Sequence, residues 1–250
     1  MRSAIYMLIV MQLEHCTWPE VEQYLKRTTG ILLPIGSIEQ HGPTALIGTD
    51  AICAQAIAEA VGDAQGILVA PPIPVGLAEH HMAFAGSMTL RKETMVALIE
   101  DYTASLYRHG FRRFYFINGH GGNIGVLNST LKELVNRKAT PEATYTFVNW
   151  WAGPRTKKLR EAWYSTGEGL HSTPSEIAVT QIARPVVMNP AQRLEPAPTS
   201  RNIGTAENYR ATYPDGRMGS DPALATPEAG RALIASAVTD IAEHYQGFVG

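Results

Sequence analysis

The stretch LLPIGSIEQHGPTALIGTD, residues 32–50, joins a predicted buried strand to a group of candidate metal ligands. An apolar run at residues 31–35 predicts the strand, and Gly36 ends it. Glu39 and His41 follow two residues apart, so in an extended segment both side chains leave on the same side. They can therefore converge on one ion or on two neighbouring ions.

Asp50 closes this stretch and directly precedes an apolar-periodic segment, residues 51–61, which predicts a helix. Asp50 then occupies the position of a helix N-cap, which is the commoner role of an isolated aspartate. The alternative is that Asp50 joins Glu39 and His41 as a third metal ligand. Spacing leaves both interpretations open, because a metal motif needs its structural context to confirm it.

Composition indicates one domain that acts on a small molecule. With 250 residues, 45% of them hydrophobic, the chain can bury one substantial core, so we expect a single domain over residues 1–250. The formal charge of −2 and the absence of a long basic run argue against a nucleic-acid partner, which would need clustered Lys and Arg. Two cysteines, Cys16 and Cys53, are too few for a disulfide framework and favour a reducing cytoplasm.

The N-terminal residues resemble a weak signal peptide, because Arg2 precedes an apolar run at residues 4–11. The run is too short to span a bilayer, and no clear small-residue cleavage site precedes Leu13. We expect residues 1–12 to form an added or flexible start, or a packed N-terminal strand, rather than an export signal or a membrane anchor.

Short apolar runs alternate with amphipathic segments along the rest of the chain. We expect strands at residues 31–35, 67–70, 114–117 and 145–150. We expect helices at residues 18–26, 51–61, 91–109, 124–137, 174–182 and 227–245. This alternation is typical of an α/β fold, here a three-layer α/β/α sandwich with a mainly parallel sheet. Ligands of such folds bind outside the carboxyl ends of the strands.

Polar side chains gather in the loops that follow the predicted strands. NGHGGN, residues 118–123, follows the third strand; its glycines let the backbone approach a ligand, and His120 projects from the strand end. The same glycines alone could mark only a tight turn or an anion-binding nest. His80 and His81 lie in the loop at residues 75–88, where each is either a pocket residue or an ordinary surface or core histidine.

Four motifs along the chain form a set. They are GSIEQHGP with a following TD, then NGHGGN, then a His-led segment ending in SEIA, and GSDP with AT before the last helix. Together they resemble the creatininase family of metal-dependent amidohydrolases, and the E-x-H of Glu39 and His41 is the most specific part. The resemblance runs from about Thr17 to the C-terminal helix. It implies a creatininase-like fold, a divalent metal site and a homohexamer.

The resemblance implies four metal ligands, Glu39, His41, Asp50 and His120. Asp50 is then the bridge between two ions. Creatininase itself has a carboxylate two residues after the histidine of the NGH motif, where this chain has Gly122. Glu176 matches the glutamate of the family's H-x-x-x-x-E segment and is the natural substitute. The alternative for Glu176 is a first-turn glutamate that interacts with the helix dipole, an effect of roughly 0.3–1 kcal/mol.

These residue types also imply a reaction. His171 matches a histidine beside the substrate in creatininase, so we assign it to proton transfer or substrate orientation. Two histidines and three carboxylates, with no thiolate, suit two divalent ions per chain, whether Zn, Mn or Fe. Such ions lower the pKa of a bound water toward neutrality and polarise an amide carbonyl. His171 or Glu176 is then the candidate acid for the leaving nitrogen.

The sequence defines the substrate less well. We expect four residues to contact it: His81, Trp150, Trp151 and Gly121. The tryptophans could stack on a planar ring, although aromatic residues at a strand end are more often core or subunit contacts. Residues 184–221 show little periodicity and are expected to pack over the pocket or a neighbouring subunit, and Trp163 to lie in a covering loop.

The predicted function is hydrolysis of a non-peptide C–N bond in a small cyclic amide or formamide by a cytoplasmic enzyme. Gly122 weakens the case for creatinine itself, as does Pro174, which replaces the first glutamate of the family's HAGE-x-E segment. A short-peptide hydrolase of the same family is the first alternative. A non-catalytic small-molecule-binding member is the second, because Gly122 cannot supply an oxygen ligand.

Overall fold

Three parallel strands form the centre of the computed structural model, which describes residues 11–137, 140–185, 194–201 and 203–250. They are β1 (Gly30–Ile35), β2 (Arg113–Asn118) and β3 (Thr144–Asn149), in the order β1-β2-β3. The register pairs Ile35 with Asn118, and Asn118 with Asn149. All three strands therefore end at one edge of the sheet, which is where the loops with the candidate ligands begin.

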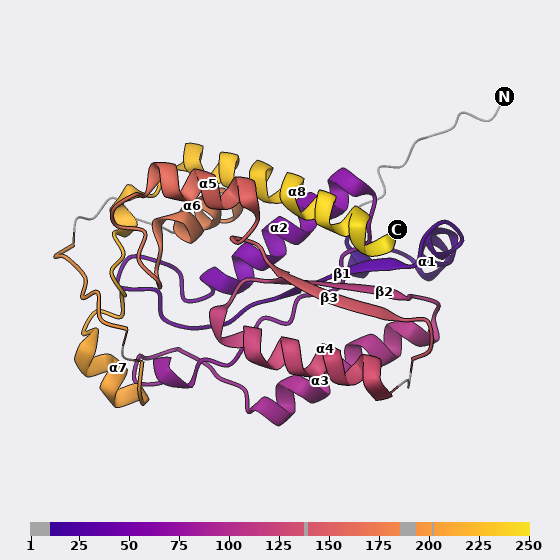
Figure 1. The fold of residues 1–250 in the computed structure, drawn as a ribbon, viewed down its shortest axis with the longest axis horizontal. Coiled ribbons are helices and arrows are strands. Elements are labelled where there is room, and N and C mark those ends of the chain that lie inside the picture. The colour runs from indigo at the N-terminus through magenta and orange to yellow at the C-terminus, as the bar shows by residue number, and fades with distance from the viewer. Residues whose placement is uncertain (1–10, 138–139, 186–193, 202) are drawn as a thin grey trace.

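Helices cover both faces of the sheet (Figure 1). One layer contains α3 (Lys92–Arg108) and α4 (Ile124–Arg137). The other contains α2 (Thr49–Gln65), α5 (Pro154–Trp163), α6 (Pro174–Ala183) and α8 (Pro227–Val249). Two shorter helices, α1 (Trp18–Leu25) and α7 (Ala206–Thr212), lie at opposite ends of the view. The predicted three-layer α/β/α sandwich with a parallel sheet is confirmed.

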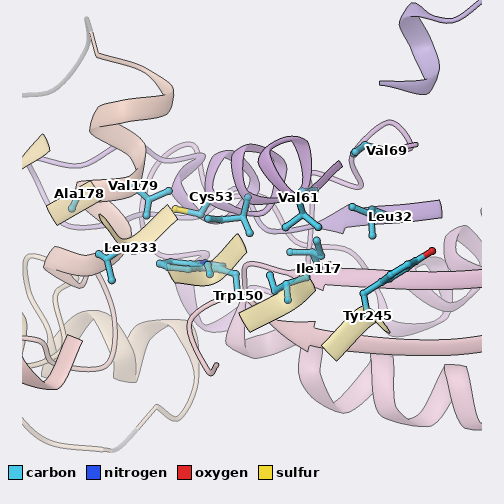
Figure 2. Close-up of a cluster of buried hydrophobic side chains, with 14 of the residues drawn as sticks. Leu32, Cys53, Val61, Val69, Ile117, Trp150, Ala178, Val179, Leu233 and Tyr245 are labelled. Atoms are coloured by element: carbon cyan, nitrogen blue, oxygen red, sulfur yellow. The ribbon is translucent and has the colours of Figure 1, made fainter. Parts of the chain in front are cut away.

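Strand β2 shows how one sheet supports two cores. Phe114 and Phe116 point into the cluster that packs under α3 and α4, while Tyr115 and Ile117 point into the cluster under α2, α6 and α8. All four side chains are buried, as expected for a strand covered on both faces, where successive residues alternate between layers. Figure 2 shows Ile117 in the second cluster, together with Trp150 from the end of β3.

The segment at residues 67–70, predicted as a strand, lies beside β1 but makes only isolated bridges. Val69 pairs in parallel with Leu32 and with Gln12. The prolines Pro71 and Pro72 follow directly and, because proline has no backbone N–H, they interrupt the ladder, which resumes as one bridge between Ile35 and Ile73. Gln12 thus belongs to the sheet's outer margin, whereas the expectations for residues 1–10 lie outside the described residues.

Two other expectations need correction. Helix α2 begins at Thr49 with Gly48 as its N-cap, so Asp50 lies inside the first turn and the N-cap interpretation is wrong. Helix α5 was not predicted, because its sequence PRTKKLREAW is too polar to show an apolar period; Trp163 ends this helix and is not part of a loop. Among the described helices, none combines the length and apolar character needed to cross a bilayer.

Candidate metal centre

The candidate ligands come from four elements that meet at the carboxyl edge of the sheet. Glu39 and His41 lie in the loop after β1, and His120 follows β2. Asp50 lies in the first turn of α2, and Glu176 in the first turn of α6. The first four are at most 5% exposed, and the side chain of Glu176 is 16% exposed. Such burial of charged groups requires compensation by partners or by ions.

The five side chains form two overlapping groups. In the first, His120 Nδ1 lies 3.3 Å from Glu39 Oε1 and 3.0 Å from Asp50 Oδ2. In the second, His41 Nε2 lies 3.2 Å from Asp50 Oδ1 and 3.9 Å from Glu176 Oε1. The ligand atoms within each group all lie within 4.8 Å of one another. Asp50 belongs to both groups, with one oxygen facing each histidine, which is the arrangement that a bridging carboxylate needs.

Backbone carbonyls orient both histidines. His41 Nδ1 donates to the carbonyl of Glu39 at 3.0 Å, so Nε2 faces the carboxylates. His120 Nε2 donates to the carbonyl of Leu77 at 3.0 Å, so Nδ1 faces them. Metal-binding histidines are commonly held in this way, with one ring nitrogen fixed by a carbonyl and the other directed at the ion.

Two buried atoms at the centre of the cluster lack hydrogen-bond partners among the described residues: His41 Nε2 and Asp50 Oδ2. Leaving a buried polar atom unsatisfied costs about 1–3 kcal/mol, and more for a charged group. A cation between the groups would satisfy both atoms. The residues present therefore fit a divalent metal, and nitrogen and carboxylate donors without thiolate suit Zn, Mn or Fe.

The electrostatics of the cluster favour positive charge. Burial alone would lower the pKa of His41, but the Asp50 and Glu176 carboxylates raise it to about 10. Burial would raise the pKa of Asp50, but His41 and His120 hold it well below its usual range. Burial dominates at Glu39, whose pKa is raised although His120 opposes the shift. The carboxylates thus favour positive charge between the two groups, where a metal ion would lie.

Glu176 has both of the roles that the sequence left open. It forms a capping box at the start of α6, where Thr173 is the N-cap and the Thr173 N–H donates to Glu176 Oε1 at 2.5 Å. The same oxygen faces His41 in the second ligand group. Burial raises the pKa of Glu176 to about 7, partly opposed by His41.

Gly122 makes room for the His120 ring. A Cβ at this position would lie 2.3 Å from His120 Nε2 and 2.4 Å from the Leu77 carbonyl oxygen, so any larger residue would disturb that hydrogen bond. A Cβ at Gly121 would meet nothing within 4 Å. The absence of a carboxylate at position 122 is therefore linked to the orientation of His120 in this chain.

A cavity of about 410 Å³ opens over the cluster. All the predicted substrate-contacting residues line it, namely His81, Trp150, Trp151 and Gly121. Trp150 is only 2% exposed and belongs mainly to the core, while Trp151 is half-buried. Helix α7 covers one side through Tyr209, in agreement with the expectation that part of residues 184–221 packs over the pocket.

His171 and His81 stack beside Glu39, with their ring centroids 4.4 Å apart. His171 Nδ1 lies 3.6 Å from Glu39 Oε1, and His81 Nε2 lies 3.4 Å from the same oxygen. Burial lowers the pKa of both rings, and neighbouring histidines add to the effect, so both are neutral near pH 7. His171, predicted for proton transfer, thus has one ring nitrogen directed at the cluster.

Sequence reasoning missed three residues of the site. Arg160 lines the cavity from α5, a helix without an apolar pattern, and Tyr209 lines it from α7. Gln40 lies between Glu39 and His41 and contacts both His81 and His171. Only its place inside the E-x-H motif could have drawn attention to Gln40.

The chain is similar to known proteins over most of its length. The family model Creatininase, described as creatinine amidohydrolase, matches residues 14–245. The mycofactocin precursor peptide peptidase of Mycobacterium ulcerans is 31% identical over 234 residues, covering 90% of this chain and 83% of that protein. The creatinine amidohydrolase of Pseudomonas putida is 31% identical over 113 residues, covering 43% of this chain and 44% of that protein.

Solved structures show the same fold. A creatininase in its manganese form superposes with a TM-score of 0.82 at 21% identity, covering 95% of this chain and 98% of that chain. Another creatininase structure is described as a Zn-Zn type. Because the family model spans nearly the whole described chain, these findings lead to one conclusion: the chain belongs to the creatininase family of hydrolases.

Proposed function

We propose that this protein hydrolyses an amide C–N bond of a small substrate, using divalent ions held by two groups of side chains. The observation that carries the proposal is the convergence of both groups on Asp50 at the floor of the cavity. Glu39 and His120 would hold one ion with Asp50, and His41 and Glu176 the other. Two ions per chain is the number that this sharing supports.

Divalent ions in such sites supply a water of lowered pKa and polarise the carbonyl under attack. The chain's own residues handle the protons. His171 Nδ1 faces the cluster as a proton acceptor and can return that proton to the leaving nitrogen. Glu176 is less suited to this task, because its Oε1 already accepts a hydrogen bond from Thr173. The water oxygen joins the carbonyl carbon, the C–N bond breaks, and one water proton goes to the leaving nitrogen.

Two substrate classes fit the cavity. A small cyclic amide or formamide suits its volume of about 410 Å³ and the half-buried Trp151 in its lining. A short peptide is favoured by a different observation, since the relative that covers 90% of this chain is named a peptide peptidase. Arg160 is the one Lys or Arg among the described residues that line the cavity; its Nε pairs with Glu168 at 2.6 Å, so a terminal carboxylate would share this guanidinium with Glu168.

Side-by-side assays separate these classes. Creatinine, a formylated aminopyrimidine and a panel of short peptides with free or amidated C-termini are tested on the same metal-loaded preparation. Cleavage of the cyclic amide or formamide supports the first class, and cleavage of peptides only, with a preference for free C-termini, supports the second.

Metal analysis tests the proposal itself. We expect about two ions per chain, lost in His41→Ala and retained in His109→Ala, a variant of an exposed histidine. A chain that stays metal-free in added Zn²⁺ or Mn²⁺ contradicts hydrolysis and supports a binding protein.

We further propose a homohexamer. Several large apolar side chains are exposed, including Trp163, Leu170 and Leu224, and these would be covered in an assembly. Light scattering coupled to gel filtration measures the mass directly; a monomer of 27.2 kDa would contradict this assembly.

A further inference from the structure

The Gln40 side chain contacts two histidines that line the catalytic cavity. It is 7% exposed, and its Nε2 lies 2.9 Å from the Gly216 carbonyl, 3.0 Å from His81 Nδ1 and 3.0 Å from His171 Nε2. Its Oε1 accepts from the Gly42 N–H at 2.9 Å. Because an amide nitrogen has only two hydrogens, it cannot donate to all three neighbours.

The orientation of the amide is set by its two backbone partners. Gly42 offers an N–H, which needs the amide oxygen, and Gly216 offers a carbonyl, which needs the amide nitrogen. A flipped amide would place hydrogen against hydrogen at Gly42 and oxygen against oxygen at Gly216. One of the two amide hydrogens is therefore committed to Gly216.

The position of the proton on His171 follows from a second contact. His171 Nε2 lies 2.6 Å from the backbone carbonyl oxygen of Gln40. A carbonyl only accepts, so His171 Nε2 must carry the proton and cannot also accept from the Gln40 amide. In the neutral ring Nδ1 then bears a lone pair, and this is the atom that faces Glu39.

The proton on His81 is placed by elimination. With Gly216 taking one amide hydrogen and His171 unable to accept, the second hydrogen goes to His81 Nδ1. The neutral His81 ring therefore carries its own proton on Nε2, the nitrogen that faces Glu39 Oε1 at 3.4 Å. The two stacked rings thus present opposite groups to the cluster, an N–H from His81 and a lone pair from His171.

We propose that Gln40 is a positioning residue that fixes these two tautomers, and that His81 is thereby the hydrogen-bond donor of the site and His171 the acceptor. The assignment of tautomers follows from the hydrogen-bond contacts of a neutral ring; their use in catalysis rests on the proposed function. During amide hydrolysis the His81 N–H, directed at Glu39 Oε1, would orient that candidate ligand, while His171 accepts the proton of the attacking water.

Nitrogen NMR of the full-length chain tests the assignment directly, without any substrate. With ¹⁵N-labelled histidine, long-range ¹H–¹⁵N spectra distinguish a protonated from an unprotonated ring nitrogen, and His81→Gln and His171→Gln identify the signals. We expect both rings protonated on Nε2, before and after addition of Zn²⁺. Protonation of His81 on Nδ1 in the wild type would overturn the proposal.

In Gln40→Glu a carboxylate oxygen replaces the amide nitrogen, so it accepts where the amide donates and also faces the Gly216 carbonyl; Gln40→Met is therefore measured beside it. The His81 proton should move to Nδ1, while His171 should stay protonated on Nε2. Gln40→Met, which neither donates nor accepts strongly, should leave His81 as a mixture of tautomers, and it serves if Gln40→Glu does not fold. Gln23→Glu on the exposed face of α1 is the matched control. A His81 ring unchanged in both Gln40 variants contradicts the role of Gln40.

Kinetics then separates this inference from the proposed function. On whichever substrate the wild type cleaves, Gln40→Glu should lower kcat by about 10–100-fold, as for loss of a group that orients a metal ligand. If the NMR spectra show the expected tautomers but no substrate is hydrolysed, the proposed function is refuted and the tautomer assignment is unaffected. Hydrolysis with unchanged kcat in Gln40→Glu would refute the catalytic use of His81.

Discussion

Two buried aspartates, Asp240 and Asp50, have different surroundings in this chain. The side chain of Asp240, on α8, is 3% exposed, and that of Asp50, on α2, is 4% exposed. Asp240 receives hydrogen bonds from the backbone N–H of Thr156 at 2.9 Å and of Arg155 at 3.2 Å, and from both of their side chains. Asp50 faces two histidine nitrogens, and its Oδ2 has no hydrogen-bond partner among the described residues.

Burial alone does not distinguish a structural carboxylate from a metal ligand; the groups around the carboxylate do. Asp240 ties α8 to the first turn of α5, where free backbone N–H groups are available, so its charge is compensated by the protein. Asp50 lies among groups that offer lone pairs or titrating nitrogens, so its compensation must come from protons or metal ions. The first pattern is typical of a structural carboxylate and the second of a ligand.

Asp50→Asn should have the largest effect, because it removes a charge shared by both ligand groups. Bound metal should fall to near zero, a loss of affinity beyond the roughly 10–100-fold cost of removing a group that only orients a ligand. The stabilisation by metal, about 2.7 kcal/mol when free metal is at 100 Kd, should vanish with it. Metal analysis measures the bound metal, and thermal unfolding with and without Zn²⁺ measures the stabilisation. Equal metal content in Asp50→Asn and Asp240→Asn would contradict a ligand role for Asp50.

His171→Gln should slow catalysis while leaving the metal in place. The loss of a proton-transfer group costs about 10²–10⁴-fold in rate, because the proton must then pass through bulk water. Steady-state kinetics gives the rate and metal analysis of the same sample gives the occupancy. Loss of metal in this variant would instead place His171 among the ligands, as its grouping with Glu39 and His41 allows.

Gly122→Ala should weaken metal binding by about 10–100-fold, because the new Cβ would displace His120 from the Leu77 carbonyl. Gly121→Ala, with open space around its Cβ, is the matched control and should bind metal normally. Competition with a chelating dye measures the affinities. Near Asp240 the equivalent glycine is Gly153, whose Cβ would lie 2.3 Å from the carboxylate; Gly153→Ala should lower stability and spare the metal.

Asp240→Asn should have the smallest effect, a loss of about 1–3 kcal/mol in the free energy of unfolding at pH 7. Burial would raise the pKa of Asp240, but hydrogen bonds from Thr156 and Arg155 lower it overall. A carboxyl with a lowered folded-state pKa stabilises the fold above its unfolded pKa of about 3.9 and loses that contribution as the pH falls through the folded pKa. Urea unfolding from pH 7 to pH 3 should therefore show the wild type approaching the variant.

The sequence predicted the layers of the fold because buried parallel strands and amphipathic helices leave strong periodic patterns. Helix α4 was placed at its observed bounds, residues 124–137. Helix α5 is not predicted because its polar sequence has no apolar period, and the carboxylate that bonds its first turn, Asp240, lies 84 residues beyond Thr156. The segment at 67–70 has the apolar residues of a strand, but the prolines that follow interrupt its pairing, which resumes only at Ile73.

The residues of the candidate site were also predicted only in part. The spacing of Glu39 and His41 and the family resemblance were enough to name five side chains that the structure brings together around Asp50. Their role as ligands stays a prediction until metal is measured. Gln40 and Arg160 could not be predicted from the sequence. Gln40 bonds to Gly216 and Arg160 lines the cavity only because segments distant in the chain meet in the fold.

One carboxylate oxygen of Glu176 has two roles: it accepts the hydrogen bond that caps α6, and it faces the position proposed for a metal ion. An ion that withdraws electron density from this oxygen must weaken the bond from the Thr173 amide, and by linkage a frayed first turn of α6 must alter the affinity for the ion. The rate at which the Thr173 amide hydrogen exchanges with deuterated solvent should therefore report whether the metal site is occupied.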